Sequence, residues 1–133
     1  MKYKMAAIPI HIENPFDIIR EEIITEYLNC EQCYPWIVTF SGGKDSTLVA
    51  HLVFEALLTL PPNMRKRQVY FVSNDTLVES PLVVRHMRSE LNRIIKAAEI
   101  LKLPIHGEVT VPKLRETFWT LLIGKGYPSP NRT

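Results

Sequence analysis

The spacing of apolar residues predicts four helices. Steps of three and four residues, which place apolar side chains on one helical face, occur over 15–29 and again over 81–102. Residues 44–60 are apolar almost all round, which predicts a helix buried against a sheet. A further helix is expected over 113–124, where glycines end it.

Three short apolar runs lie between these helices, and they predict strands. Residues 36–40, 68–72 and 104–111 are rich in β-branched and aromatic side chains. The resulting order, α-β-α-β-α-β-α, predicts an α/β fold with a doubly wound parallel sheet and helices on both faces. We expect residues 1–35 to form an N-terminal helix and loop, and residues 36–133 to form the main domain.

Composition narrows the class of protein. The chain has 133 residues, is 46% hydrophobic and 23% charged, and carries a formal net charge of +2. These values are typical of one soluble globular domain, and the charge alone is too small to indicate nucleic-acid binding. With no apolar run near the ~18 residues of a membrane span, no signal peptide and only two cysteines, we expect a cytoplasmic protein without membrane contact. The last residues, Pro128–Thr133, follow an apolar stretch without a closing helix or strand, so we expect a chain cut within a longer protein.

The main chemical signal is a polar loop, Ser41–Ser46, between a predicted strand and a predicted helix. Ligands of open α/β sheets bind at the carboxyl ends of the strands. Gly42 and Gly43 allow a phosphate to approach the backbone, and the helix that follows offers unpaired N–H groups. Ser41 and Ser46 add hydroxyl donors. The loop therefore predicts a phosphate site, and the alternative is a strand-to-helix turn without a ligand.

Two charged residues give this loop a chemical role. Lys44 can place a positive charge on a phosphate. Asp45 would repel phosphate directly, so we expect it to hold Mg²⁺ or to orient the loop. The Walker A and dinucleotide-binding patterns are both absent.

For the other candidate residues, the sequence allows both a functional and a purely structural interpretation. Asp75 and Glu79, near the end of the second strand, are expected to contact ribose, Mg²⁺ or substrate; otherwise they are a capping aspartate and a solvated glutamate. The helix over 81–102 carries a basic face that could follow a DNA backbone, although a solvated helix face is favoured. That face comprises Arg85, Arg88, Arg93 and Lys96, together with Ser89 and Asn92. Cys30 and Cys33 form a lone C-x-x-C, interpreted first as two reduced cysteines and second as part of a sulfur relay or cluster.

The same residues resemble a known superfamily. The string SGGKDS after a strand resembles the PP-loop of the N-type ATP pyrophosphatases, which have the adenine nucleotide alpha-hydrolase fold and cleave ATP between its α- and β-phosphates. The segment 69–76, with Glu79 and Pro81, looks like the phosphoadenosine phosphosulfate reductase branch. Three runs together resemble the DndC family of sulfurtransferases of bacterial DNA phosphorothioation: WIVTFSGGKDSTL, VSNDTLVESP, and ETFW with GYPSPNRT.

The resemblance implies a function. In this family ATP adenylates a DNA backbone phosphate, and sulfur from a cysteine desulfurase replaces an oxygen. ATP and Mg²⁺ would bind Ser41–Ser46 and Asp75, with Glu79 and Arg132 at the substrate. Partners would be DNA, the desulfurase and other phosphorothioation proteins, while a 4Fe-4S cluster would require cysteines of a longer protein. The alternatives are a phosphoadenosine phosphosulfate reductase-like enzyme and a non-catalytic fragment that binds a nucleotide or partner.

Overall fold

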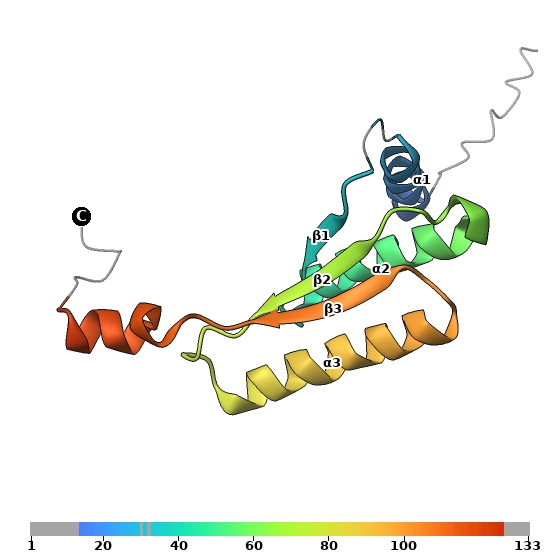
Figure 1. Cartoon of the computed structure of the whole chain (residues 1–133). Coiled ribbons are helices and arrows are strands. Elements are labelled where there is room, and N and C mark those ends of the chain that lie inside the picture. The colour runs from blue at the N-terminus through green and yellow to red at the C-terminus, as the bar shows by residue number, and fades with distance from the viewer. Residues whose placement is uncertain (1–13, 30, 32, 127–133) are drawn as a thin grey trace, which may run out of the picture.

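Helices and strands alternate along the chain (Figure 1). The computed structural model describes residues 14–29, 31 and 33–126. In this part of the chain, each of the first six predicted elements is present, with ends within two residues of the predicted bounds. The elements are α1 (Pro15–Leu28), β1 (Trp36–Thr39), α2 (Lys44–Thr59), β2 (Val69–Asn74), α3 (Pro81–Ile100) and β3 (Ile105–Thr110), with a short 3₁₀ turn, η1 (Pro62–Met64), before β2.

The predicted helix over 113–124 is wrong. The chain there forms a 3₁₀ turn, η2 (Leu114–Glu116), and a single π-helical turn, η3 (Thr120–Gly124). Thr117 separates them in an extended conformation, and its hydroxyl accepts the N–H of Thr120 at 3.3 Å. A threonine side chain that bonds nearby backbone groups competes with a continuous helix.

The strands form one parallel sheet in the order β1-β2-β3. Val38 pairs with Phe71, and Phe71 pairs with Gly107, so these residues share one face of the sheet. Parallel pairing confirms the α/β class.

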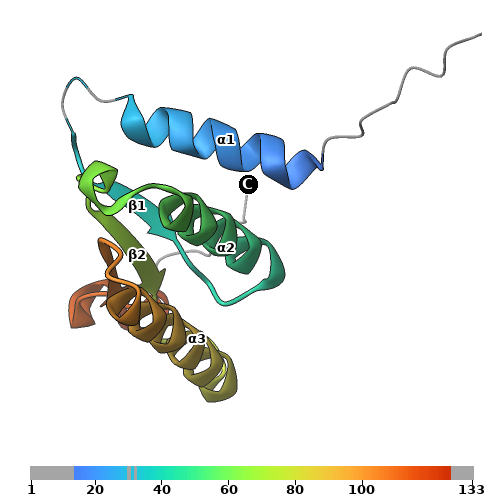
Figure 2. The same ribbon diagram turned by 90° about the vertical axis from the view of Figure 1, so that its right-hand side faces the viewer.

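Helices α2 and α3 cover the same face of this sheet. Right-handed crossovers between strands that follow in spatial order place successive helices on one side. The buried cluster accordingly joins Phe71 and Ile105 of the sheet to Leu57 of α2 and Leu91 of α3. Gly107 allows α3 to lie close, because a Cβ there would come within 2.7 Å of the Ile95 side chain. Figure 2 shows α2 and α3 next to one another beside the strands.

The opposite face of the sheet is open in the described part of the chain. Ile37 of β1 is 71% exposed, and His106 and Glu108 of β3 are also exposed. Helix α1 packs on α2 rather than on this face. The second helical layer expected of a doubly wound sheet is therefore not supplied by α1, α2 or α3.

Helix α2 is also less buried than its apolar sequence predicts. Its inner face is buried, but three of its apolar side chains are 40–49% exposed. They are Leu48, Val49 and Leu58. A helix that covers only one face of a sheet has a solvent side, which explains the difference.

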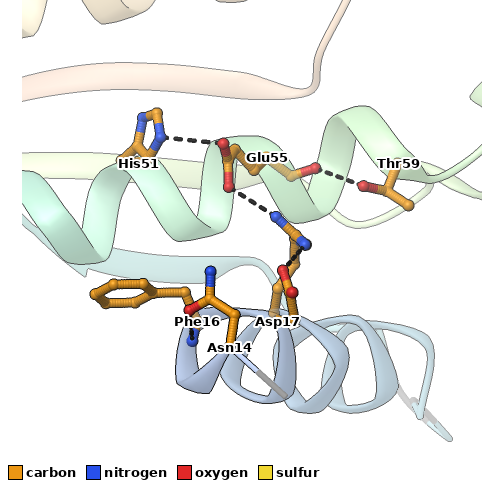
Figure 3. A network of polar contacts seen from close by, with 7 residues as sticks. Asn14, Phe16, Asp17, His51, Glu55 and Thr59 are labelled. Atoms are coloured by element: carbon orange, nitrogen blue, oxygen red, sulfur yellow. Dashed lines mark hydrogen bonds and ion pairs between the residues drawn. The ribbon is translucent and has the colours of Figure 1, made fainter. Parts of the chain in front are cut away.

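Two contacts hold α1 in place. Arg20 of α1 donates to Glu55 of α2 at 3.0 Å and also pairs with Asp17, while His51 approaches Glu55 at 3.1 Å (Figure 3). Near the other end of α1, the Tyr27 hydroxyl donates to the carbonyl of Arg67 at 2.6 Å. Helix α1 is thus fixed to the core that supports the sheet.

Candidate functional site

The Ser41–Ser46 loop joins the carboxyl end of β1 to the start of α2, as predicted. Gly42 has a φ of +79°, and a Cβ on it would lie 3.1 Å from the Cα of Met87 in α3. Gly43 is the N-cap residue of α2 and has no side chain to cap the helix. The first N–H groups of α2 therefore remain available to an anion, which benefits from the positive end of the helix dipole.

Hydroxyl groups stabilise the shape of the loop. Ser46 Oγ accepts the N–H of Ser41 at 3.2 Å and lies 3.0 Å from Ser41 Oγ. Thr47 Oγ1 donates to the carbonyl of Gly43 at 2.6 Å. These bonds connect the two ends of the loop, so a phosphate would meet a loop that is already ordered.

Lys44 and Asp45 lie in the first turn of α2, and both are exposed. Neither residue forms an ion pair with another described residue. The described residues contain no group of three His, Cys, Asp or Glu side chains that could hold a metal. Mg²⁺ commonly needs only one or two carboxylates when phosphates supply other ligands, so Asp45 fits an ion held between protein and nucleotide.

Asp75 lies just beyond β2 at the same edge of the sheet. The two strand ends are joined there by Ser73 Oγ, which donates to the carbonyl of Phe40 at 2.6 Å. Asp75 is buried, and its carboxylate accepts from Arg88 at 3.2 Å and from the N–H of Leu77 at 3.1 Å. Its carboxylate thus binds protein groups, and a contact to ribose, Mg²⁺ or substrate stays a prediction.

A pocket of about 730 Å³, lined by both polar and apolar residues, adjoins Asp75. Glu79 lines this pocket, together with residues of α3 on its other side. The predicted basic face of α3 is divided here: Arg85 and Arg88 line the pocket, while Arg93 pairs with Glu90 at 2.9 Å. The sequence placed Arg85, Arg88, Ser89 and Asn92 on one helical face, but it did not indicate that this face forms a pocket with Asp75 and Glu79.

Cys33 lies away from the loop, at the opposite end of β1. Cys33 is disulfide-bonded, so the expected reduced state is wrong for this residue. The C-x-x-C spacing, which is common in redox pairs, was the sequence feature that could have indicated a disulfide. Cys33 precedes β1 and the loop follows it, which separates them by at least ~13 Å at ~3.3 Å per strand residue. The structure therefore does not support direct sulfur transfer from Cys33 to the loop within one chain. Cys30 and Arg132 lie outside the described residues.

No helix in the described residues is both long and apolar enough to cross a membrane.

Comparison with known proteins supports the fold and leaves the family open. No protein-family model matches the chain, and no curated protein matches it. Among solved structures, the chain is similar to NH₃-dependent NAD synthetase from Campylobacter jejuni, solved in complex with the nitrate ion, with a TM-score of 0.50 and 19% identity. The match covers 89% of this chain and 41% of that protein, so the chain spans less than half of its length. The chain thus has an α/β fold with a three-stranded parallel sheet of the adenine nucleotide alpha-hydrolase-like type.

Proposed function

We propose that the chain binds ATP with Mg²⁺ on the Ser41–Ser46 loop as the nucleotide-binding part of an ATP pyrophosphatase. The observation that carries the proposal is the loop itself: Gly42 at positive φ beneath α3, with exposed Lys44 and Asp45 at the open start of α2. Such a loop at the carboxyl edge of a parallel sheet suits a chain of phosphates.

The chemistry would be electrostatic. The loop N–H groups and Lys44 would bind the phosphates and stabilise the negative charge that develops on the leaving pyrophosphate. Bound Mg²⁺ would neutralise phosphate charge, and Asp45 would hold the ion. A loop already ordered by Ser41 and Ser46 needs little reorganisation for this task.

For the acceptor, we propose a DNA backbone phosphate that is adenylated and then receives sulfur, as in DNA phosphorothioation. This choice is supported by the DndC-like phrases of the sequence and by arginines at the pocket beside Asp75. A cysteine desulfurase and other phosphorothioation proteins would be partners. A 4Fe-4S cluster, if the protein has one, would need ligands besides those of the described residues.

The test compares the wild-type chain with a Lys44→Ala, Asp45→Ala variant. ATP binding is measured by calorimetry with Mg²⁺, and pyrophosphate release is measured on the same samples. We expect ATP affinity to fall ~10- to 100-fold, since charge-assisted hydrogen bonds contribute ~1.5–3 kcal/mol each. The matched control is Lys96→Ala, Glu99→Ala, which removes the same charges from the exposed side of α3.

The outcomes separate binding from catalysis. Release that the loop variant loses and the control keeps would support the whole proposal. Binding without release would restrict this chain to nucleotide binding. A wild-type chain that binds no ATP, or a loop variant that binds as well as the control, would refute the site.

A further inference from the structure

Arg67 is a buried arginine whose guanidinium lacks an acceptor in the described part of the chain. The residue is 8% exposed, and among the described residues its buried Nε–H has no hydrogen-bond partner. Its guanidinium also forms no ion pair with another described residue. Arginine does not lose its proton, and buried charges are normally paired or hydrogen-bonded. An unpaired buried guanidinium therefore indicates a place for an anion.

The nearby Arg65 is satisfied by the protein itself. It donates to three carbonyls at the end of α2, those of Leu57, Leu58 and Leu60, at 2.8–3.2 Å. A helix leaves its last carbonyls without intrahelical partners, so Arg65 serves as a cap of α2. In the basic run 65–67, the buried guanidinium that the described residues leave unpaired is that of Arg67.

Two aromatic rings hold the Arg67 guanidinium in place. Its central carbon lies 5.3 Å from the centre of the Trp36 ring and 5.8 Å from the centre of the Tyr27 ring. The Tyr27 hydroxyl also donates to the Arg67 carbonyl at 2.6 Å. Aromatic faces stabilise the positive charge but accept no conventional hydrogen bonds from its N–H groups. The side chain is thus positioned before a ligand arrives, which reduces the ordering cost of binding.

Arg67 lines a pocket of about 400 Å³, within the ~300–1,000 Å³ typical of ligand sites. The described lining residues carry two positive charges, those of Arg67 and Lys66, and no carboxylate. Asn63 adds a hydrogen-bonding amide, while Leu28 and Met64 add apolar surface. A lining that combines positive charge with apolar groups suits a small organic anion.

The pocket lies at the amino ends of the strands. Arg67 comes two residues before β2, and Trp36 is the first residue of β1. The Ser41–Ser46 loop follows the other end of β1, at least ~13 Å away at ~3.3 Å per strand residue. The pocket is therefore a second site, separate from the nucleotide site of the proposed function.

We propose that this pocket binds a small organic dicarboxylate. One carboxylate accepts hydrogen bonds from the Arg67 guanidinium, whose planar set of donors matches a carboxylate. The second carboxylate pairs with Lys66, and the carbon chain between them contacts Leu28 and Met64. Two negative charges on the ligand balance the two positive charges of the lining.

Succinate is the probe, and the Nε–H signal of Arg67 in nitrogen–proton correlation NMR is the readout. Its absence from the spectrum of Arg67→Lys assigns this signal. We expect succinate to shift it saturably and to leave the Nε–H signal of Arg65 in place, because that group already has acceptors. Succinamide, the neutral analogue, should shift neither signal. Because the readout is local to Arg67, binding of the probe at the Ser41–Ser46 loop would not imitate the result.

Two variants test the lining by calorimetry with succinate. Arg67→Lys keeps the charge but removes the planar donors, and it should bind ~10-fold more weakly. Lys66→Ala should bind ~2- to 5-fold more weakly, as expected when an exposed charge is lost. Lys96→Ala removes an exposed charge from α3 and, as the control, should bind like the wild type. Urea unfolding checks the fold of Arg67→Lys, and Lys66→Ala tests the pocket even if that variant is unfolded.

Three results would overturn the proposal. Without a saturable shift in the wild-type chain, Arg67 would be a purely structural side chain held by its two rings. A shift with inorganic phosphate but not with succinate would assign the pocket to a different anion. Equal affinities in Lys66→Ala and Lys96→Ala would remove the second carboxylate contact. The loop variant Lys44→Ala, Asp45→Ala should bind succinate like the wild type, so failure of the nucleotide site and failure of this pocket are distinguishable.

Discussion

At the scale of single residues, Gly42 is the position where a substitution should disturb both the backbone conformation and the candidate phosphate loop. Its φ of +79° disfavours any side chain, and a Cβ would lie 3.1 Å from the Cα of Met87. We expect Gly42→Ala to lower the free energy of unfolding by ~2–3 kcal/mol: ~1–2 kcal/mol for the left-handed backbone, and the rest for the contact with α3. ATP affinity should fall as well, because the loop must shift away from α3.

Gly126→Ala is the control for this prediction. Gly126 has a φ of +66°, but a Cβ there would meet nothing within 4 Å. Only the backbone cost of ~1–2 kcal/mol should appear in urea unfolding, without a loss of ATP affinity. Equal losses of stability and equal ATP affinities in the two alanine variants would show that the close contact of Gly42 with α3 affects neither stability nor ATP binding, which would contradict the prediction.

At the scale of elements, Tyr27 connects α1 to the chain just before β2. Burial raises the pKa of its hydroxyl above the ordinary value of 10.0, although the positive charges of Arg67 and Arg65 act in the opposite direction. The folded protein therefore keeps this proton at a pH where the unfolded chain has lost it. Stability from this group is complete below about pH 10 and is lost as the pH rises toward the folded pKa.

Tyr27→Phe tests this connection. The variant should lose ~1 kcal/mol at neutral pH, the usual value of a hydrogen bond. It should also show a smaller decline of unfolding free energy above about pH 10, measured by urea titration at a series of pH values. Parallel declines in the two proteins would show that Tyr27 does not ionise differently on unfolding.

Elements could be predicted from sequence where local signals agree. Asn14 and Ser80 are N-caps followed by proline, and both helices begin as predicted. The Ser41–Ser46 loop could also be predicted, because its glycines and serines directly follow an apolar strand and precede a helix. The prediction of a helix over 113–124 failed because the hydroxyl of Thr117 bonds the backbone and divides the segment into two turns. The spacing of apolar residues does not reveal such a side-chain bond.

At the scale of the whole molecule, sequence reasoning reached the α/β class but not the distribution of layers. Strand order decides this, because β1-β2-β3 with right-handed crossovers places α2 and α3 on one face. Strand order depends on contacts between residues far apart in the chain. The contact of Gly42 with Met87 and the pocket along α3 also join residues far apart in the chain, so the sequence could not show that these residues lie together.

The two faces of the sheet should therefore respond differently to the same type of substitution. Ile37 and Val38 are neighbours in β1, but Ile37 is 71% exposed on the open face and Val38 packs against the core. Threonine keeps the β-branched shape, so strand propensity changes little. Val38→Thr should lower the free energy of unfolding by ~1–3 kcal/mol because it places a hydroxyl beside apolar groups, whereas Ile37→Thr should change it by less than ~0.5 kcal/mol. Urea unfolding measures both values, and a large loss in Ile37→Thr would mean that this face is covered in the protein in solution.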